Sequence, residues 1–176
     1  MFPMIATLRD YLRAKEIFEE ERAKMKVSQV PLGVMVEVPS VAVMADQFAR
    51  EVDFFSVGTN DLTQYTLAMD RGHPMLASQV DALNPGVLSL IGQAATAAHK
   101  YDRWIGVCGG VASDPQAIPL LVGLGVDELS CSIPAIPSVK ANVRSYSYTQ
   151  CQDLAASALR KDTAAAVRDL VPLDED

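Results

Sequence analysis

Short apolar runs alternate with longer helical stretches along the whole chain. The apolar runs have the length and composition of buried strands, and they cover 1–6, 31–36, 54–57, 104–108 and 127–133. The stretches between and after them are amphipathic or rich in helix-forming residues, and they cover 8–26, 41–50, 62–68, 85–100, 115–122, 137–146, 151–160 and 162–170. The pattern therefore predicts five strands that alternate with helices.

Strands without polar alternation are typical of a parallel sheet that is buried on both faces. Two α/β architectures fit this pattern, a doubly wound sheet and a (β/α) barrel. No internal repeat, low-complexity block or linker divides the 176 residues. We therefore expect a single domain over 1–176, with an acidic tail at 172–176 that frays.

Composition excludes several classes of function. The 15 basic and 22 acidic residues give a net charge of −7, which argues against a general binder of nucleic acid or of membrane surfaces. The chain has no run of 18 or more apolar residues and no secretory signal pattern, so we expect no membrane insertion and a cytoplasmic location. The three cysteines form no CxxC pair, so neither a disulfide framework nor a zinc site is expected.

Polar side chains follow three of the predicted strands at the point where each strand ends. Glu37 follows the second strand, Asn60 and Asp61 follow the third, and Cys108 ends the fourth. Parallel strands end at the same edge of a sheet, so these side chains are expected to lie at one mouth. Two carboxylates at this mouth could bind Mg²⁺, which would also be coordinated by oxygens of a bound phosphate. Arg71 could bind that phosphate as well.

Each of these residues also has a purely structural interpretation. Asn60 or Asp61 could serve only as the cap of the helix that follows. Cys108 could be an ordinary buried cysteine, and Arg71 could belong to a surface ion pair. The chain contains neither a Walker loop nor a GxGxxG sequence, so it offers no other phosphate-binding motif.

Four runs of sequence carry a more specific resemblance. They are Gly33 to Pro39, Val52 to Tyr65, Met69 to Gly72, and Gly106 to Gly109. In order and spacing they resemble the phosphoenolpyruvate (PEP)-binding domain of enzyme I, the PEP-protein phosphotransferase of bacterial sugar uptake. The resemblance covers residues 1 to about 145. Pyruvate phosphate dikinases and PEP synthases share the weaker features.

The resemblance implies a (β/α)8 barrel, a transferase activity, and a site for PEP or pyruvate together with Mg²⁺. By motif position, Glu37 and Asp61 would ligate the metal. Asn60 and Arg71 would contact the phosphate. Cys108 would be the acid that protonates the enolate carbon as pyruvate forms.

The chain differs from typical enzyme I at one position next to these runs. Typical enzyme I has a glutamate after the Cys-Gly pair, and Gly110 occupies that position here. The run that continues to Asp114 instead resembles multiphosphoryl transfer proteins, in which an enzyme I module is fused to a fructose-specific module. The outer hydrogen bonding of the Cys108 thiol is therefore expected to differ from that of typical enzyme I.

The predicted strands account for part of such a barrel, about its last five βα units. The family's phosphorylated histidine lies on a separate domain, and neither His73 nor His99 is in a matching motif. The implied partners are that phosphohistidine domain and a phosphocarrier protein. An open piece of a barrel exposes two strand edges and one apolar face, so we also expect a homo-oligomer or a partner that completes the barrel.

Three functions remain open at this level. The chain could be a phosphotransferase module that binds PEP and Mg²⁺ and acts only with the missing parts. It could be a non-catalytic module that senses PEP or pyruvate, or a remnant that only oligomerises. A piece of a pyruvate phosphate dikinase or PEP synthase relative is a further alternative.

Overall fold

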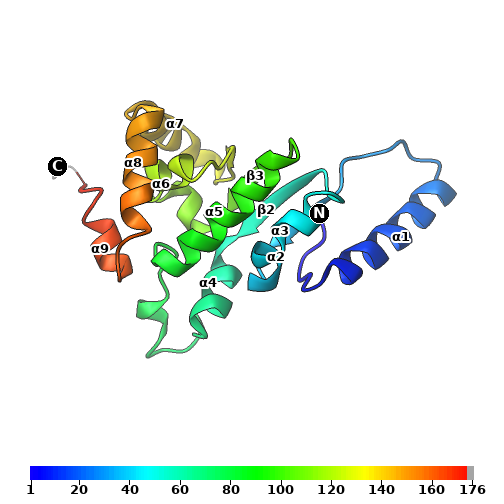
Figure 1. Ribbon diagram of the computed structural model, residues 1–176, viewed down its shortest axis with the longest axis horizontal. Coiled ribbons are helices and arrows are strands. Elements are labelled where there is room, and N and C mark those ends of the chain that lie inside the picture. The colour runs from blue at the N-terminus through cyan, green and yellow to red at the C-terminus, as the bar shows by residue number, and fades with distance from the viewer. Residues whose placement is uncertain (174–176) are drawn as a thin grey trace.

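The computed structural model describes residues 1–173 and contains one parallel sheet flanked by helices (Figure 1). Its strands lie in the order β1-β2-β3-β4, and they are β1 Gly33–Val36, β2 Phe54–Gly58, β3 Trp104–Cys108 and β4 Glu128–Leu129. Val36 is in register with Val57, and Gly58 is in register with Cys108. The carboxyl ends of β1, β2 and β3 therefore lie side by side, as the sequence predicts.

The helices confirm most of the predicted segments. They are α1 Leu8–Lys24, α2 Pro39–Val43, α3 Ala45–Phe48, α4 Thr59–Leu67, α5 Pro85–Lys100, α6 Ile118–Gly123, α7 Ile136–Arg144, α8 Tyr148–Ala158 and α9 Ala164–Arg168. Short 3₁₀ turns are η1 Ala77–Gln79, η2 Gly110–Ser113 and η3 Ile133–Ala135. The helix expected over 41–50 is divided at Met44 into α2 and α3. No helix within 1–173 is long and apolar enough to cross a membrane.

The prediction of five full strands is wrong in two places. The expected strand at 1–6 is only a single parallel bridge between Phe2 and Val34. The N–H of Met4 would be the next donor to β1, but Met4 has a φ of 52° and donates to the Glu37 side chain instead. The last strand has two residues, Glu128–Leu129, and the rest of the expected segment lies in irregular structure and in the start of η3 at Ile133. From residue 174 on, the expected acidic tail lies outside the described residues.

The two faces of the sheet differ. Helix α5 packs on β2 and β3, and α2 packs on β1, so Phe55, Ile105 and Val107 are fully buried on this helical face. The opposite face, called the inner face here, is only partly covered: Phe54 is half-buried and Trp104 is 42% exposed. The partly covered inner face departs from the expectation of strands buried on both faces, and it agrees with the exposed apolar face that we expect of an open sheet.

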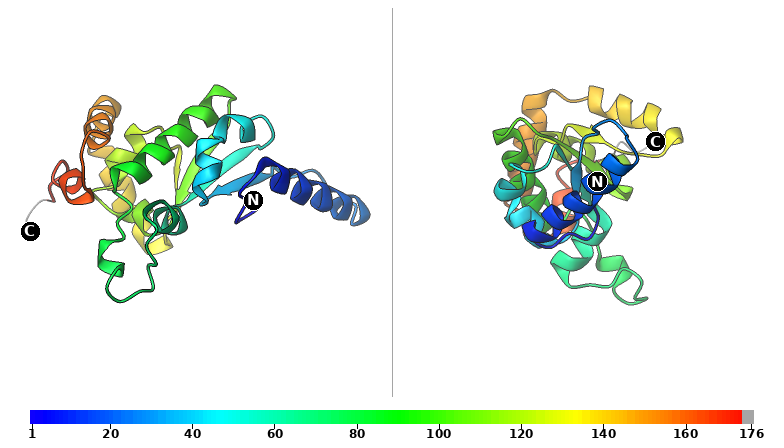
Figure 2. Two further views of the ribbon diagram at one scale, coloured as in Figure 1. Left: turned by 60° about the horizontal axis from the view of Figure 1, so that its bottom comes forward. Right: turned by 90° about the vertical axis from the view of Figure 1, so that its right-hand side faces the viewer.

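Helix α1 extends away from the sheet, at the end of the molecule opposite α8 and α9 (Figures 1 and 2). A capping box between Thr7 and Asp10 starts the helix. Its first turns are anchored by Tyr11, whose ring is fully buried and meets Phe2 and Phe48 edge to face. Burial, with smaller effects from Asp53 and Glu51, raises the pKa of Tyr11 to about 12. Tyr11 therefore attaches α1 to the body of the fold.

Candidate functional site

Glu37 directly follows β1 and is nearly buried, with 6% of its surface exposed. Its Oε1 accepts a 2.6 Å hydrogen bond from the backbone N–H of Met4, which fixes the carboxylate at the end of the strand. Its Oε2 lies 3.0 Å from where a side-chain carbon at Gly58 would stand. A glycine at the end of β2 therefore leaves room for this carboxylate.

Asn60 and Asp61 lie in the first turn of α4, which begins immediately after β2. The N-cap of this helix is Gly58, so the interpretation of Asn60 or Asp61 as the cap is wrong. Asp61 Oδ1 lies 3.5 Å from Nη2 of Arg71, which comes from the loop that follows α4. Arg71 does form an ion pair, as one alternative held, but its partner is a carboxylate of the candidate site.

A small cavity of about 160 Å³ opens beside this turn. One wall carries hydroxyl, amide and guanidinium groups, from Thr59, Asn60, Thr63 and Arg71. The other wall is apolar and consists of Ala77, Val80 and Ala82. The structure thus brings Asn60 and Arg71 together around one hollow that can hold a small anionic group.

Cys108 ends β3 and is half-buried. Its thiol donates a hydrogen bond to the Val57 carbonyl oxygen at 3.3 Å, and the Ser56 hydroxyl donates to its sulfur at 4.0 Å. Its own carbonyl oxygen accepts a 2.8 Å hydrogen bond from the Thr59 hydroxyl. The thiol is therefore held at the end of β2 rather than packed into the core. Cys151, in contrast, is buried, and burial raises the pKa of its thiol.

The turn after Cys108 packs tightly on α4. Gly109 has a φ of 100° and a ψ of −177°, a conformation that residues other than glycine rarely adopt. A side-chain carbon at Gly109 would lie 2.6 Å from Thr59 Oγ1 and 3.2 Å from Asn60 Oδ1. Only glycine therefore lets the end of β3 approach the first turn of α4.

Three residues with hydroxyl side chains make contacts in this region that the sequence did not predict. Ser56 and Thr59 hydrogen-bond to Cys108, and Thr63 donates to the Thr59 carbonyl oxygen at 2.7 Å. All three are buried. The contact of Ser56 could have been expected from the sequence, because a serine inside an apolar strand needs a polar partner.

The described residues contain no group of three or more His, Cys, Asp or Glu side chains placed to hold a metal ion. Mg²⁺ does not require such a group, because it keeps several waters and binds through one or two carboxylates plus substrate phosphate. Glu37 directly follows β1, and Asp61 lies in the first turn of α4 directly after β2, so each of these two strand ends supplies one carboxylate. The donor set of the candidate site therefore fits Mg²⁺.

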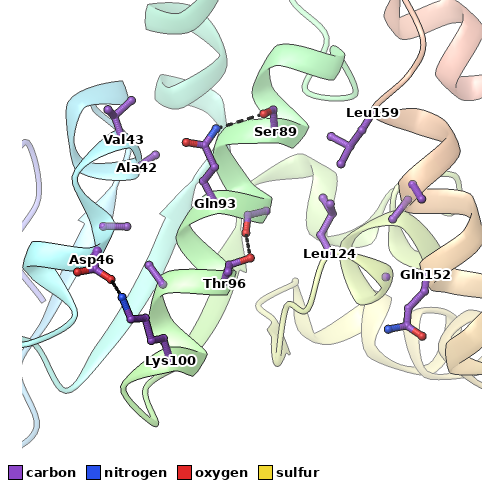
Figure 3. Close-up of a pocket in the computed structure, with 16 residues that line it drawn as sticks. Ala42, Val43, Asp46, Ser89, Gln93, Thr96, Lys100, Leu124, Gln152 and Leu159 are labelled. Carbon is purple, nitrogen blue, oxygen red and sulfur yellow. Dashed lines mark hydrogen bonds and ion pairs between the residues drawn. The ribbon is translucent and has the colours of Figure 1, made fainter.

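A larger hollow of about 690 Å³ lies on the helical side of the sheet, between α2 and α3, α5, and the α6 and α8 pair. Figure 3 shows that its charged groups, Asp46 and Lys100, pair with each other. Gln93 donates to Ser89 within α5. Thr96 donates to the Gly92 carbonyl oxygen, and none of the site residues expected from the sequence lines the hollow.

Comparisons with known proteins agree on one family. The family model described as "PEP-utilising enzyme, PEP-binding domain" matches residues 1–148. A multiphosphoryl transfer protein of Rhodobacter capsulatus is 51% identical over 170 residues, which are 97% of this chain and 21% of that protein. A phosphoenolpyruvate-protein phosphotransferase of Listeria monocytogenes is 44% identical over 177 residues, covering 97% of this chain and 31% of that protein.

Among solved structures, a citrate lyase of Burkholderia xenovorans matches with a TM-score of 0.61 at 16% identity. The match covers 96% of this chain and 60% of that one. At such low identity the likeness shows a shared α/β fold with a parallel sheet and nothing about activity. The chain itself spans between a fifth and a third of the length of the two curated relatives above.

Proposed function

Because the chain belongs to the family of PEP-utilising enzymes, whose PEP-binding domain it matches over residues 1–148, we propose that it binds PEP and Mg²⁺ within a PEP-protein phosphotransferase. The family inferred from the sequence is thereby confirmed. Phosphoryl transfer would go to a histidine on a separate domain and then to a phosphocarrier protein for sugar uptake. Relatives named multiphosphoryl transfer protein and phosphoenolpyruvate-protein phosphotransferase support this assignment.

We further propose that the sheet is part of a (β/α)8 barrel. Two observations support a barrel over a doubly wound sheet. The strands are neighbours in chain order, without the reversal that a doubly wound sheet contains. Helices α2 and α5 pack on the same face, whereas the inner face is only partly covered, as the interior of an incomplete barrel would be.

The observation that carries the proposed function is the grouping of Asn60, Asp61 and Arg71 at the carboxyl end of β2. The Arg71 guanidinium can bind two phosphate oxygens at once, and the Asn60 amide can donate to a third. Asp61 forms an ion pair with Arg71, whose side chain also lines the hollow. A phosphate in this position would lie beside the turn at Gly109, which directly follows Cys108.

The proposed acid is Cys108. Its Sγ proton is held by the Val57 carbonyl oxygen, in a hydrogen bond that a reacting carbon can replace. When bound, Mg²⁺ would supply positive charge that stabilises the enolate and the phosphoryl oxygens, and Glu37 and Asp61 are its proposed ligands. The three cysteines are free thiols, which supports action in a reducing compartment such as the cytoplasm.

Isothermal titration with PEP, with and without Mg²⁺, tests this proposal. We expect binding that depends on Mg²⁺ and that weakens at least about tenfold in Glu37→Gln and in Asp61→Asn. Glu37→Gln is informative, because the glutamine oxygen can still accept the Met4 N–H while the charge is lost. Asp153→Ala, on the outer helix α8, is the matched control and should bind as the wild type does.

The outcomes separate the candidate functions. No heat of binding for the wild-type chain would contradict the proposal and favour a remnant that only oligomerises. Binding that the two carboxylate variants leave unchanged would contradict the metal assignment. Binding without phosphoryl transfer in the complete enzyme would favour a module that senses PEP or pyruvate.

A further inference from the structure

Arg168, at the end of α9, makes ionic hydrogen bonds to two separate loops. Its Nε and Nη2 donate to the two carboxylate oxygens of Asp81 at 2.7 and 3.0 Å. Its Nη1 donates to Asp114 Oδ2 and to Gln116 Oε1, both at 2.9 Å. We call this set, Arg168 with Asp81, Asp114 and Gln116, the α9 clasp.

Both loops continue from elements of the candidate site. Asp81 ends the segment that leaves α4 after Leu67 and carries Arg71. Asp114 and Gln116 follow Cys108 and the short turn η2. The α9 clasp therefore ties the Arg71 loop to the segment beyond β3, although Arg168 and Asp81 are 87 residues apart in sequence.

The Arg71 loop is fixed mainly at its two ends. At its start, the Arg71 N–H donates to the Gln64 side chain at 3.2 Å. At its end, Asp81 Oδ1 also accepts the Leu83 N–H at 2.9 Å, and Leu83 is fully buried. Between these points the loop supplies Val80 and its neighbours to the apolar wall of the 160 Å³ cavity. The position of Asp81 therefore sets the position of that wall.

The geometry of the α9 clasp makes it stronger than an ordinary surface ion pair. The Arg168–Asp81 contact is bidentate, and the side chains of Arg168, Asp81 and Asp114 are 33%, 26% and 22% exposed. Hydrogen bonding to Asp81 raises the pKa of Arg168 further above its ordinary range. Gln116 also donates to the Arg168 and Val171 carbonyl oxygens at 2.9 and 2.8 Å, which holds the end of α9 in place.

We propose that Arg168 is a positioning residue for PEP binding, which acts by holding the Arg71 loop against the ends of β2 and β3. This inference rests on the proposed function. Arg168 itself touches neither the cavity nor Arg71. Its effect passes through Asp81 to the cavity wall and so to the guanidinium that receives the phosphate. A role limited to anchoring α9 would leave the affinity for PEP unchanged.

The test combines hydrogen exchange with titration of PEP and Mg²⁺ on the full chain. In Arg168→Ala we expect faster exchange of amides in 70–82, unchanged exchange in β2, and an affinity for PEP about tenfold weaker. Arg168→Lys keeps the charge but loses the bidentate contact, so it should lie between Arg168→Ala and the wild type. Arg160→Ala is the control, because Arg160 hydrogen-bonds only within its own turn, to Ser157. Asp81→Asn is a milder variant, and it replaces Arg168→Ala if that chain does not fold.

Each result has a definite meaning. Faster exchange in 70–82 together with weaker binding supports the positioning role. If the wild type binds PEP and Arg168→Ala binds equally well, the inference is overturned and the proposed function stands. Loss of protection in α9 alone, with 70–82 unchanged, overturns it as well. If the wild type does not bind PEP, the proposed function fails and the positioning role fails with it.

Discussion

The Thr59 hydroxyl donates a 2.8 Å hydrogen bond to the carbonyl oxygen of Cys108, which joins the first turn of α4 to the end of β3. Thr59 is fully buried. Asn60 and Asp61 follow it directly, so this bond sets the distance between the turn that carries these two residues and the Cys108 thiol.

Thr59→Val should lower the free energy of unfolding by about 1–2 kcal/mol, because a buried hydrogen bond is lost at nearly constant shape. Urea denaturation measures the change. Thr96→Val is the control: Thr96 is exposed on α5 and hydrogen-bonds only to Gly92 one turn earlier. It should change stability by no more than about 0.5 kcal/mol. Equal effects of the two substitutions would show that the Thr59 bond adds nothing specific.

Gly109→Ala should destabilise the chain by at least about 1–3 kcal/mol. Its backbone conformation is nearly exclusive to glycine, and the added carbon would lie 2.6 Å from Thr59 Oγ1. Gly110→Ala is a close control, because a carbon at Gly110 would meet no atom within 4 Å. Thermal unfolding of the two variants should differ clearly, and equal melting temperatures would contradict this account of the turn.

Gly110 also allows the carboxylate of typical enzyme I to be restored. Since the space around it is open, Gly110→Glu should fold with a stability close to that of Gly110→Ala. Comparing Gly110→Glu with Gly110→Ala therefore separates the effect of the added carboxylate on the Cys108 thiol from any effect on folding.

Cys108→Ala should leave the affinity for PEP nearly unchanged and lower enolate protonation about 100-fold or more. The measurement is pyruvate formation by the complete phosphotransferase, alongside titration of PEP. Cys131→Ala is the control, because Cys131 is also half-buried but lies beyond β4, outside the candidate site. Loss of PEP binding in Cys108→Ala would instead indicate a structural thiol.

Local pattern predicted the elements well where their boundaries are encoded by neighbouring residues. Thr7 starts α1, and the Asn84 side chain caps α5 through the Gly86 N–H, as their residue types suggest. The strand Trp104–Cys108 also lies where expected. These features depend on contacts over a few positions, which the sequence displays directly.

Features that depend on distant contacts were not predictable in this way. The start of α4 at Thr59 depends on how the helix packs on η2 and on Cys108. The α9 clasp pairs Arg168 with Asp81 from opposite halves of the chain, so no pattern of nearby residues could predict it. The sequence correctly predicted that the carboxyl ends of these strands lie side by side. The roles of their polar residues in binding and catalysis stay predictions.

The chain should form a dimer or higher oligomer at micromolar concentration, because its inner face is only partly covered and the edge of β1 that faces away from β2 is bridged by Phe2 alone among the described residues. Trp104, the single tryptophan, is 42% exposed on that face and stacks on Phe54 at 4.6 Å. Its fluorescence should shift to shorter wavelength as concentration rises. Light scattering that gives a well-folded monomer at micromolar concentration would contradict the expectation.

Acid should weaken the α9 clasp. Burial by itself would raise the pKa of Asp81, but hydrogen bonds from Arg168 and the Leu83 amide outweigh it and lower that pKa. A carboxyl with a lowered pKa stabilises the fold above its unfolded pKa of about 3.9, and this stabilisation is lost as the pH falls through the folded value.

The free energy of unfolding of the wild type and of Asp81→Asn should therefore differ at pH 7 and converge below about pH 4. Urea denaturation at a series of pH values measures both. A difference that stays constant down to pH 3 would mean that the charge of Asp81 does not support the clasp.

The junction at Gly58 also limits how this chain can vary in length. Gly58 is both the last residue of β2 and the N-cap of α4, so no loop separates the strand from the helix. One inserted residue would turn the helix by about 100° and carry the Asp61 side chain away from Arg71. Insertions are therefore excluded between 57 and 61, while the segment from 72 to 76, exposed along most of its length, can absorb them.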